Sequence, residues 1–159
     1  MANDNAITCP AYARGRGFHL LSTRSIPVKH MAVADQVIVA KGDVVMDDGS
    51  GALALGVDGG LTDLTFIGIA ADNGGSATAS ANASTKIAVH LVGDNDLMWA
   101  PVEAGTIAAT SVGEVFDLES EDGIDQGDTG LGTRAVGFHV IAVDTTNAMA
   151  LGRFIRSAS

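Results

Sequence analysis

The segment QVIVAKGDVVMDDGSGALALGV, residues 36–57, decides the class of fold. It holds three short runs rich in β-branched and aliphatic residues, which are QVIVA at 36–40, DVVM at 43–46 and ALALGV at 52–57. The pair Asp48-Gly49 separates the last two runs, and such pairs supply the positive φ that a tight hairpin turn requires. The segment therefore predicts short antiparallel strands joined by tight turns.

The same pattern continues through the rest of the chain. No window holds apolar residues at helical spacing over a helical length, whereas short β-rich runs recur at intervals typical of a sandwich or barrel. We therefore expect a single all-β domain over residues 31–159, a small β-sandwich or β-barrel of the jelly-roll or β-tulip-like kind. The further runs are LTFIGIA at 64–70, KIAVHLV at 86–92, LMWAPV at 97–102, VGEVFDL at 112–118, AVGFHVIAV at 135–143 and MALGRFI at 149–155.

The segment KIAVHLVGDNDLMWAPV, residues 86–102, predicts a hairpin whose turn is the polar stretch at 93–96. Both of its runs are apolar on both faces, which indicates strands that are covered on both sides. Trp99, the only tryptophan of the chain, lies in the second run. We expect Trp99 to lie in the core, with an anchor at a subunit interface as the alternative.

Residues 1–30 differ from the rest of the chain in composition and charge. They mix Gly, Pro, Ser and Arg with isolated apolar residues and carry four cations against one acid, whereas residues 31–152 carry three cations against eighteen acids. Without a sustained hydrophobic period, residues 1–30 are expected to form an extended basic N-terminal arm that is ordered only where it lies on another surface. The formal net charge of −10 disfavours nucleic acid or an anionic membrane as a partner.

The segment DLESEDGIDQGDTG, residues 117–130, contains six acidic residues and no cation. An EF-hand calcium loop that starts at Asp117 would need glycine at its sixth position, but Asp122 stands there, and no helical pattern flanks the segment. We therefore expect an exposed connection between two strands. Weak binding of Ca²⁺ or Mg²⁺ is the alternative.

The sequence contains no pattern that points to catalysis. The four histidines form no pair at metal-ligand spacing, and the glycine-rich stretch at 49–56 lacks the lysine of a phosphate-binding loop. Cys9, the only cysteine, excludes an intramolecular disulfide and is expected to be an inert thiol. The prediction is a protein that is not an enzyme and has no cofactor and no metal site. Because residues 1–17 hold no apolar run of signal-peptide length, we expect synthesis in the host cytoplasm.

Six segments of the chain follow one another in a recognisable order. They are AKGDVV at 40–45, FIGIA at 66–70, KIAVHLVGDNDLMW at 86–99, VGEVFDL at 112–118, VGFHVIAV at 136–143 and ALGRFI at 150–155. In this order they resemble the small β-rich decoration proteins, also called cement proteins, of tailed-bacteriophage capsids. A strand that starts as KGDVV, a strand with GIA and a late strand of the VGFxVI type are common in that family. The resemblance covers residues 36–156.

This resemblance implies a structural virion protein on the capsid exterior, which staples neighbouring subunits of the major capsid protein. It also implies self-association as a homotrimer, with a dimer as the alternative. Two other classes stay open, which are a different β-rich virion component, such as a head fibre base or a tail protein, and a small ligand-binding or hydrolytic β-barrel. The residues expected at capsid or inter-subunit contacts are Arg14, Arg16, Phe18, Arg24, Lys29 and Trp99.

Overall fold

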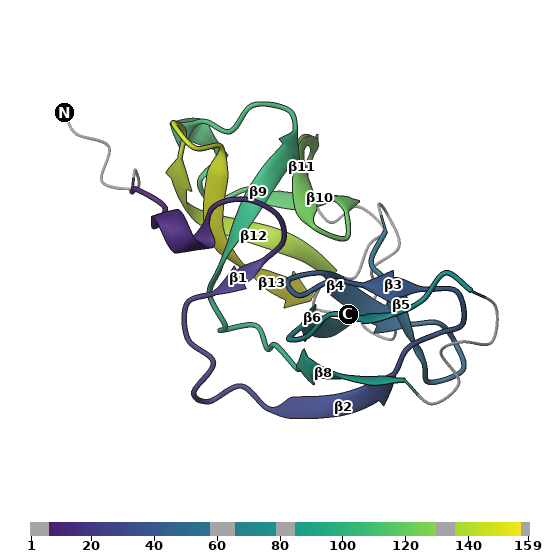
Figure 1. The fold of residues 1–159 in the computed structure, drawn as a ribbon. Coiled ribbons are helices and arrows are strands. Elements are labelled where there is room, and N and C mark those ends of the chain that lie inside the picture. The colour runs from purple at the N-terminus through teal and green to yellow at the C-terminus, as the bar shows by residue number, and fades with distance from the viewer. Residues whose placement is uncertain (1–6, 58–65, 79–84, 130–135, 157–159) are drawn as a thin grey trace.

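The computed structural model describes residues 7–57, 66–78, 85–129 and 136–156, and in these residues the chain is nearly all β (Figure 1). Two short 3-10 turns, η1 (Ala11–Ala13) and η2 (Ala109–Ser111), are the helical elements of this part. No helix within it is long and apolar enough to cross a membrane. The strands are β1 (His19–Leu20), β2 (Val28–Ala32), β3 (Ile38–Val39), β4 (Val44–Asp47), β5 (Leu53–Leu55), β6 (Phe66–Ala70), β7 (Gly74–Gly75), β8 (Lys86–His90), β9 (Met98–Ala104), β10 (Val115–Ser120), β11 (Gly123–Thr129), β12 (Val136–Asp144) and β13 (Met149–Arg156).

Strands β9, β11, β10, β12 and β13 form a closed barrel in that order, since β13 pairs back onto β9. All neighbours in the barrel are antiparallel except β9 and β11, which run parallel. The short strand β1 pairs with the first residues of β9, on the edge that β11 occupies further along. In this way the segment before residue 30 is joined to the barrel by main-chain hydrogen bonds.

The barrel-side core gathers all five phenylalanines of the chain. The Phe154 ring centroid lies 4.9 Å from that of Phe66 and 5.3 Å from those of Phe18 and Phe138, in tilted or edge-on arrangements that aromatic pairs favour. Phe116 is fully buried in the same cluster. Because Phe18 precedes the barrel and Phe66 belongs to another sheet, this cluster ties three parts of the chain together.

The second sheet has the strand order β2-β8-β6-β4-β5 (Figure 1). Just beyond β2, Val33 forms a parallel bridge with Leu53 of β5, so the two ends of the sheet approach each other at this point. Within the sheet, position 68 of β6 requires glycine, because a Cβ there would overlap the carbonyl oxygen of His90 on the neighbouring strand β8. The core of this sheet is aliphatic, and its buried members are Val33, Val39, Val45, Leu53, Ala70, Ile87 and Val89.

The predicted fold class is confirmed, since the chain is all β and contains a closed barrel. Each of the nine runs proposed as strands overlaps a strand of the structure. The turn at Asp48-Gly49 is confirmed as well. It joins β4 to β5, with the Asp48 N–H donating to the Ala52 carbonyl at 2.9 Å and Gly49 at a φ of 96°.

The hairpin predicted for residues 86–102 is wrong. Strand β8 pairs with β2 on one edge and β6 on the other, whereas β9 belongs to the barrel. The residues between them cross from the second sheet to the barrel. Each run is apolar on both faces because each is buried in its own layer, and the polar stretch at 93–96 turns the chain without returning it to the same sheet.

The exposed connection predicted for residues 117–130 is also wrong within the part that the structure describes. These residues complete β10 and form β11, a hairpin that turns at Glu121 and Asp122. Asp117 is only 2% exposed, and Leu118 and Ile124 are buried in the barrel-side core. The many acids obscure the strand pattern in the sequence. The apolar residues needed for one buried face are few, but they are correctly placed.

Candidate functional site

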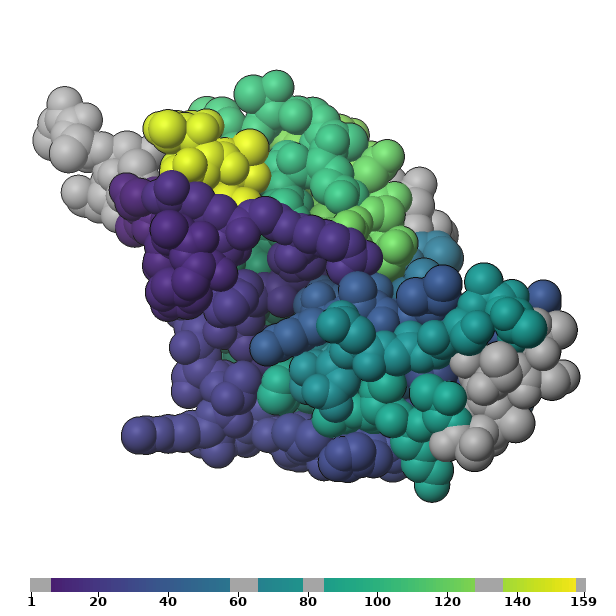
Figure 2. Space-filling model, viewed as in Figure 1, coloured from purple at the N-terminus to yellow at the C-terminus, as the bar shows by residue number. Residues whose placement is uncertain are grey.

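Residues 7–33 run across both sheets, since β1 pairs with β9 of the barrel and β2 pairs with β8 of the second sheet. In Figure 2 this purple segment covers the side of the molecule between the barrel and the second sheet. Cys9, Ala13, Phe18 and Ile26 are buried along it. The described residues of the predicted arm therefore lie on the body of the same chain, where they bury apolar side chains that a free arm would expose.

The first anchor of this segment is Asp144, at the end of β12. Its carboxylate accepts hydrogen bonds from the Cys9 N–H at 2.7 Å and from the Asn147 amide group at 2.7 Å. Burial acts to raise the pKa of Asp144, but these hydrogen bonds outweigh it and hold the pKa below the ordinary value. Burial raises the pKa of the Cys9 thiol, and Asp144 raises it further, so the thiol is kept in its less reactive form. Arg14 completes the anchor by donating from Nε to the Cys9 carbonyl at 2.9 Å.

The second anchor is an ion cluster around Arg16. The guanidinium lies 2.7 Å from Asp43, 3.0 Å from Asp122 and 3.8 Å from Glu121. Asp43 precedes β4 of the second sheet, while the two other acids form the turn between β10 and β11 of the barrel. Main-chain bonds follow the same route, since the Gly17 N–H donates to the Asp122 carbonyl at 3.2 Å. Arg16 therefore neutralises acids from both sheets where they meet.

Asp43 is the buried member of this cluster, with 1% of its surface exposed. Burial raises its pKa, while hydrogen bonds from the Ala40 N–H and from Arg16 act in the opposite direction. A buried carboxylate without a cation is costly, so Asp43 depends on Arg16 for its charge to be tolerated. Arg16 itself keeps 45% of its side chain exposed, which means that solvent screens part of this interaction.

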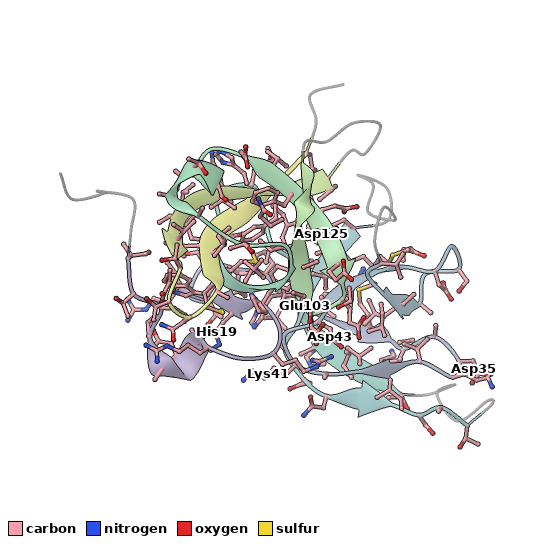
Figure 3. The ribbon with its side chains drawn as sticks, turned by 90° about the horizontal axis from the view of Figure 1, so that it is seen from above. His19, Asp35, Lys41, Asp43, Glu103 and Asp125 are labelled. Carbon is pink, nitrogen blue, oxygen red and sulfur yellow. The ribbon has the colours of Figure 1, made fainter. Side chains whose placement is uncertain are left out.

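A carboxyl pair, Glu103 and Asp122, extends the cluster into the barrel. The Ser120 hydroxyl oxygen lies 2.6 Å from an oxygen of each. One hydroxyl proton can serve only one of the two groups at a time, so the arrangement favours a proton on the other. Burial and the neighbouring Asp122 raise the pKa of Glu103, whereas Ser120, Glu103 and Arg16 lower the pKa of Asp122 against the effect of burial. Figure 3 shows Glu103 and Asp43 at this junction of the two sheets.

A hollow of about 520 Å³ lies beside Arg16, between the N-terminal segment and the ends of β6 and β8. Phe18, Leu20 and Ile69 give it apolar walls, and His19, Lys41 and His90 give it basic ones. Burial lowers the pKa of His90, and the nearby Lys41 lowers it further, with Asp72 acting in the opposite direction. His90 is therefore a neutral imidazole at neutral pH. In Figure 2 the purple segment and the blue and teal second sheet border this region.

The residues predicted at contacts have three different settings in the structure. Arg14, Arg24 and Lys29 are exposed on the N-terminal segment. Arg16 holds the ion cluster, so its charge is used within the chain. Phe18 and Trp99 are 4% and 3% exposed and pack in the monomer, which matches the core position expected first for Trp99. The sequence did not identify the residues that meet Arg16 and one another at the junction of the two sheets. These are Asp43, Glu103, Ser120, Glu121 and Asp122.

The described residues hold no group of three or more histidine, cysteine or acidic side chains placed to bind a metal ion. The acids at the junction are instead occupied by Arg16 and by Ser120. No known protein-family model matches the sequence, and no curated protein is similar to it. The surface chemistry of the chain is therefore what a functional proposal has to build on.

Proposed function

We propose that this chain is a non-enzymatic decoration protein that binds the outer surface of a phage capsid and stabilises it by bridging neighbouring subunits of the major capsid protein. The observation that supports it most is the contrast between the N-terminal segment and the body. Arg14, Arg24 and Lys29 are exposed on a segment that is fixed to both sheets, while the body carries a large excess of acids. A fixed cationic surface on an acidic protein suits an acidic partner.

The same segment also exposes apolar side chains. Tyr12 is 71% exposed, Leu21 46% and Val28 51%, and with Ile7 they are four of the six exposed large hydrophobic residues of the described chain, the other two being Ile38 and Val57. Cations next to exposed apolar groups are typical of protein contact surfaces, which combine an apolar centre with a polar rim. The exposed surface of residues 7–33 therefore supports binding to a protein. Because this segment is already ordered on the body of the chain, less entropy is lost when it docks.

The proposal includes self-association as a trimer at local threefold axes of the shell. A trimer repeats each segment three times, so contacts that are weak alone become durable when the assembly closes. The all-β body, with its closed barrel and buried aromatic cluster, supplies a compact scaffold for such contacts. It would act at the capsid exterior after synthesis in the host cytoplasm.

The direct experiment is co-sedimentation of the purified chain with expanded heads of the phage that carries its gene. We expect the wild-type chain to sediment with the heads and to raise their resistance to heat. The double variant Arg24→Gln/Lys29→Gln should bind about tenfold more weakly, since each exposed cation contributes up to about 1 kcal/mol and salt weakens it further.

A matched control compares single variants that each remove one exposed lysine. Lys29→Gln removes a cation from the N-terminal segment, whereas Lys86→Gln removes one from β8. We expect the first to weaken head binding and the second to leave it unchanged. Absence of wild-type binding to heads, with the protein folded by circular dichroism, would rule out the proposed function.

The hollow beside Arg16 supports a second candidate function, the small ligand-binding barrel. Its mixture of apolar walls with Lys41, His19 and His90 suits a small organic anion with an apolar part. Thermal shifts with a panel of small carboxylates and phosphates test this candidate. A shift that depends on ligand concentration and disappears in Lys41→Gln would favour it over head binding.

A further inference from the structure

Some main-chain N–H and C=O groups of strand β2 point away from the second sheet. Its antiparallel register with β8 pairs Val28 with His90, Lys29 with Val89 and His30 with Ala88. The Leu91 N–H donates to the Pro27 carbonyl at 2.9 Å, and the Val33 N–H donates to the Thr85 carbonyl at 3.0 Å. Hydrogen-bonded pairs alternate along an antiparallel ladder, so Lys29 and Met31 bond to β8, while the N–H and C=O groups of Val28 and His30 point outward.

The far end of β2 is closed, but its beginning is open in the described chain. Val33 bridges to Leu53, and the Ala34 N–H donates to the Leu53 carbonyl at 2.9 Å. Val28 and His30 have no such partner strand among the described residues, since β2 pairs there with β8 alone. Both are exposed, Val28 to 51%. Val28–His30 are therefore the open edge of β2.

An open strand edge invites pairing with another strand, and a second copy of this chain is the first partner to consider. The self-pairing that uses both outward residues places Val28 of each copy against His30 of the other. It also places Lys29 directly opposite Lys29 at the close, non-hydrogen-bonded position, where like charges are destabilising. A register shifted toward Ala32 would run the second copy into β5, and one shifted the other way would need the Ile26 N–H, which already donates to the Thr23 carbonyl at 3.3 Å.

We propose that the open edge of β2 accepts an extended segment of the capsid subunit as an added strand, with an acidic side chain opposite Lys29. Lys29 then has two effects, since it opposes pairing between copies and favours a strand that carries a carboxylate. Arg24, exposed three residues before Pro27, adds a second cation on the approach to this edge. Main-chain hydrogen bonds supply binding, and the charge at Lys29 selects the partner. This inference rests on the proposed function for the identity of the partner.

The first experiment needs no capsid. A short blocked peptide of alternating threonine and valine with one central glutamate serves as the probe, and its binding to the full chain is followed by backbone amide shifts. We expect the shifts to centre on Val28 and His30. Replacing the glutamate by lysine should weaken binding about threefold or more, and N-methylation of alternate peptide bonds should abolish it, because the donors are removed from the peptide and the protein is unchanged.

A matched pair of protein variants tests the same edge. His30→Pro removes an N–H that makes no bond inside the sheet, so the ladder with β8 stays intact, whereas His30→Thr keeps that N–H and changes the side chain alone. We expect His30→Pro to lose the peptide by about tenfold or more and His30→Thr to retain it. Equal binding by both variants, or by the N-methylated peptide, would overturn the inference.

Head binding separates this inference from the proposed function. Wild-type chain that binds heads, together with His30→Pro that binds equally well, would support the function and overturn the added strand. Wild-type chain that binds the acidic peptide at β2 but does not bind heads would keep the strand acceptor and overturn the function. Analytical ultracentrifugation gives an independent reading, since Lys29→Thr should associate more than the wild type, and adding His30→Pro should reverse the change.

Discussion

The barrel and the second sheet are built from different side chains, and their strands end in different ways. The five phenylalanines all belong to the barrel-side core, whereas the core of the second sheet is made of valine, leucine, isoleucine and alanine. The barrel closes through four residue pairs between β9 and β13, whereas in the described residues the second sheet meets itself at one bridge, between Val33 and Leu53. The barrel should therefore be the more stable unit, and the second sheet should open first.

This difference bears on the place of the proposed binding edge. The barrel closes on itself through β9 and β13, and β1 covers the part of the β9 edge that β11 leaves free. The second sheet keeps the open edge of β2, and the N-terminal segment holds it next to the barrel through the Arg16 cluster. The more stable core and the proposed binding edge thus lie in neighbouring but distinct parts of one chain.

The largest expected effect is on the barrel-side core. Phe154 is 1% exposed and touches Phe18, Phe66 and Phe138, so Phe154→Ala should lower the free energy of unfolding by about 3–5 kcal/mol. Urea denaturation measures the change. Tyr12→Ala is the control, because Tyr12 is 71% exposed, and its cost should stay below about 1 kcal/mol. Similar losses in the two variants would show that the phenylalanine cluster does not dominate the stability.

A smaller and more local effect is expected in the second sheet. Leu53→Ala removes a fully buried side chain at the bridge to Val33 and should cost about 2–3 kcal/mol. Because the bridge joins the two ends of this sheet, amides of β2 and β5 should lose protection from hydrogen exchange while those of β12 and β13 keep it. Uniform loss of protection in both sheets would mean that they unfold as one unit.

The connection between the two units should be weaker than either core. Arg16→Met leaves the buried Asp43 without its cation, which we expect to cost about 1–3 kcal/mol, less than for a fully buried pair because Arg16 is 45% exposed. Arg16→Lys should recover part of this loss, since it restores the charge but not the geometry of the guanidinium. Unfolding at neutral pH measures both. Equal stability of Arg16→Met and wild type would remove the cluster as a link between the sheets.

Nine strands of the body were predictable because each of them carries its own signal. Runs such as residues 135–143 combine β-branched residues with turn residues on both sides, and neither property depends on distant parts of the chain. Strand β2, with the sequence VKHMA, escaped prediction because two of its five residues are cationic or titratable. Strand β11 escaped for the same reason, since its acids mask the apolar residues that it buries. Pairing partners, as the wrong hairpin at 86–102 shows, are not encoded locally.

The junction of the two sheets could not be predicted from spacing. Arg16 meets Asp43 and Asp122, which are far apart in the sequence and are brought together only when the barrel and the second sheet are both formed. The charge contrast between residues 1–30 and the body did indicate that the segment needs an acidic surface. In the described residues, that surface belongs to the same chain for Arg16, and Arg24 and Lys29 are left at the exterior.

The smallest effect expected at this junction concerns a single proton. The pKa of Glu103 is raised above 4.5 by burial and by Asp122, so the folded chain binds this proton more tightly than the unfolded chain does. The stability that this contributes is fully present below pH 4.5 and is lost as the pH rises through the folded pKa. Glu103→Gln, which keeps a hydrogen-bond donor toward Asp122 at every pH, should not lose stability in this way.

We therefore expect Glu103→Gln and the wild type to be equally stable at low pH and the variant to become the more stable of the two toward neutral pH. The gain should stay below about 1 kcal/mol, because Glu103 is exposed and solvent screens its interaction with Asp122. Thermal unfolding of both proteins across this pH range measures the difference. Glu114→Gln is the control, since Glu114 is also exposed but is not among the groups that shift the pKa of Glu103 or of Asp122. A variant that is less stable than wild type at neutral pH would mean that Glu103 is ionised in the folded chain, as a fourth carboxylate beside Asp43, Glu121 and Asp122 of the Arg16 cluster.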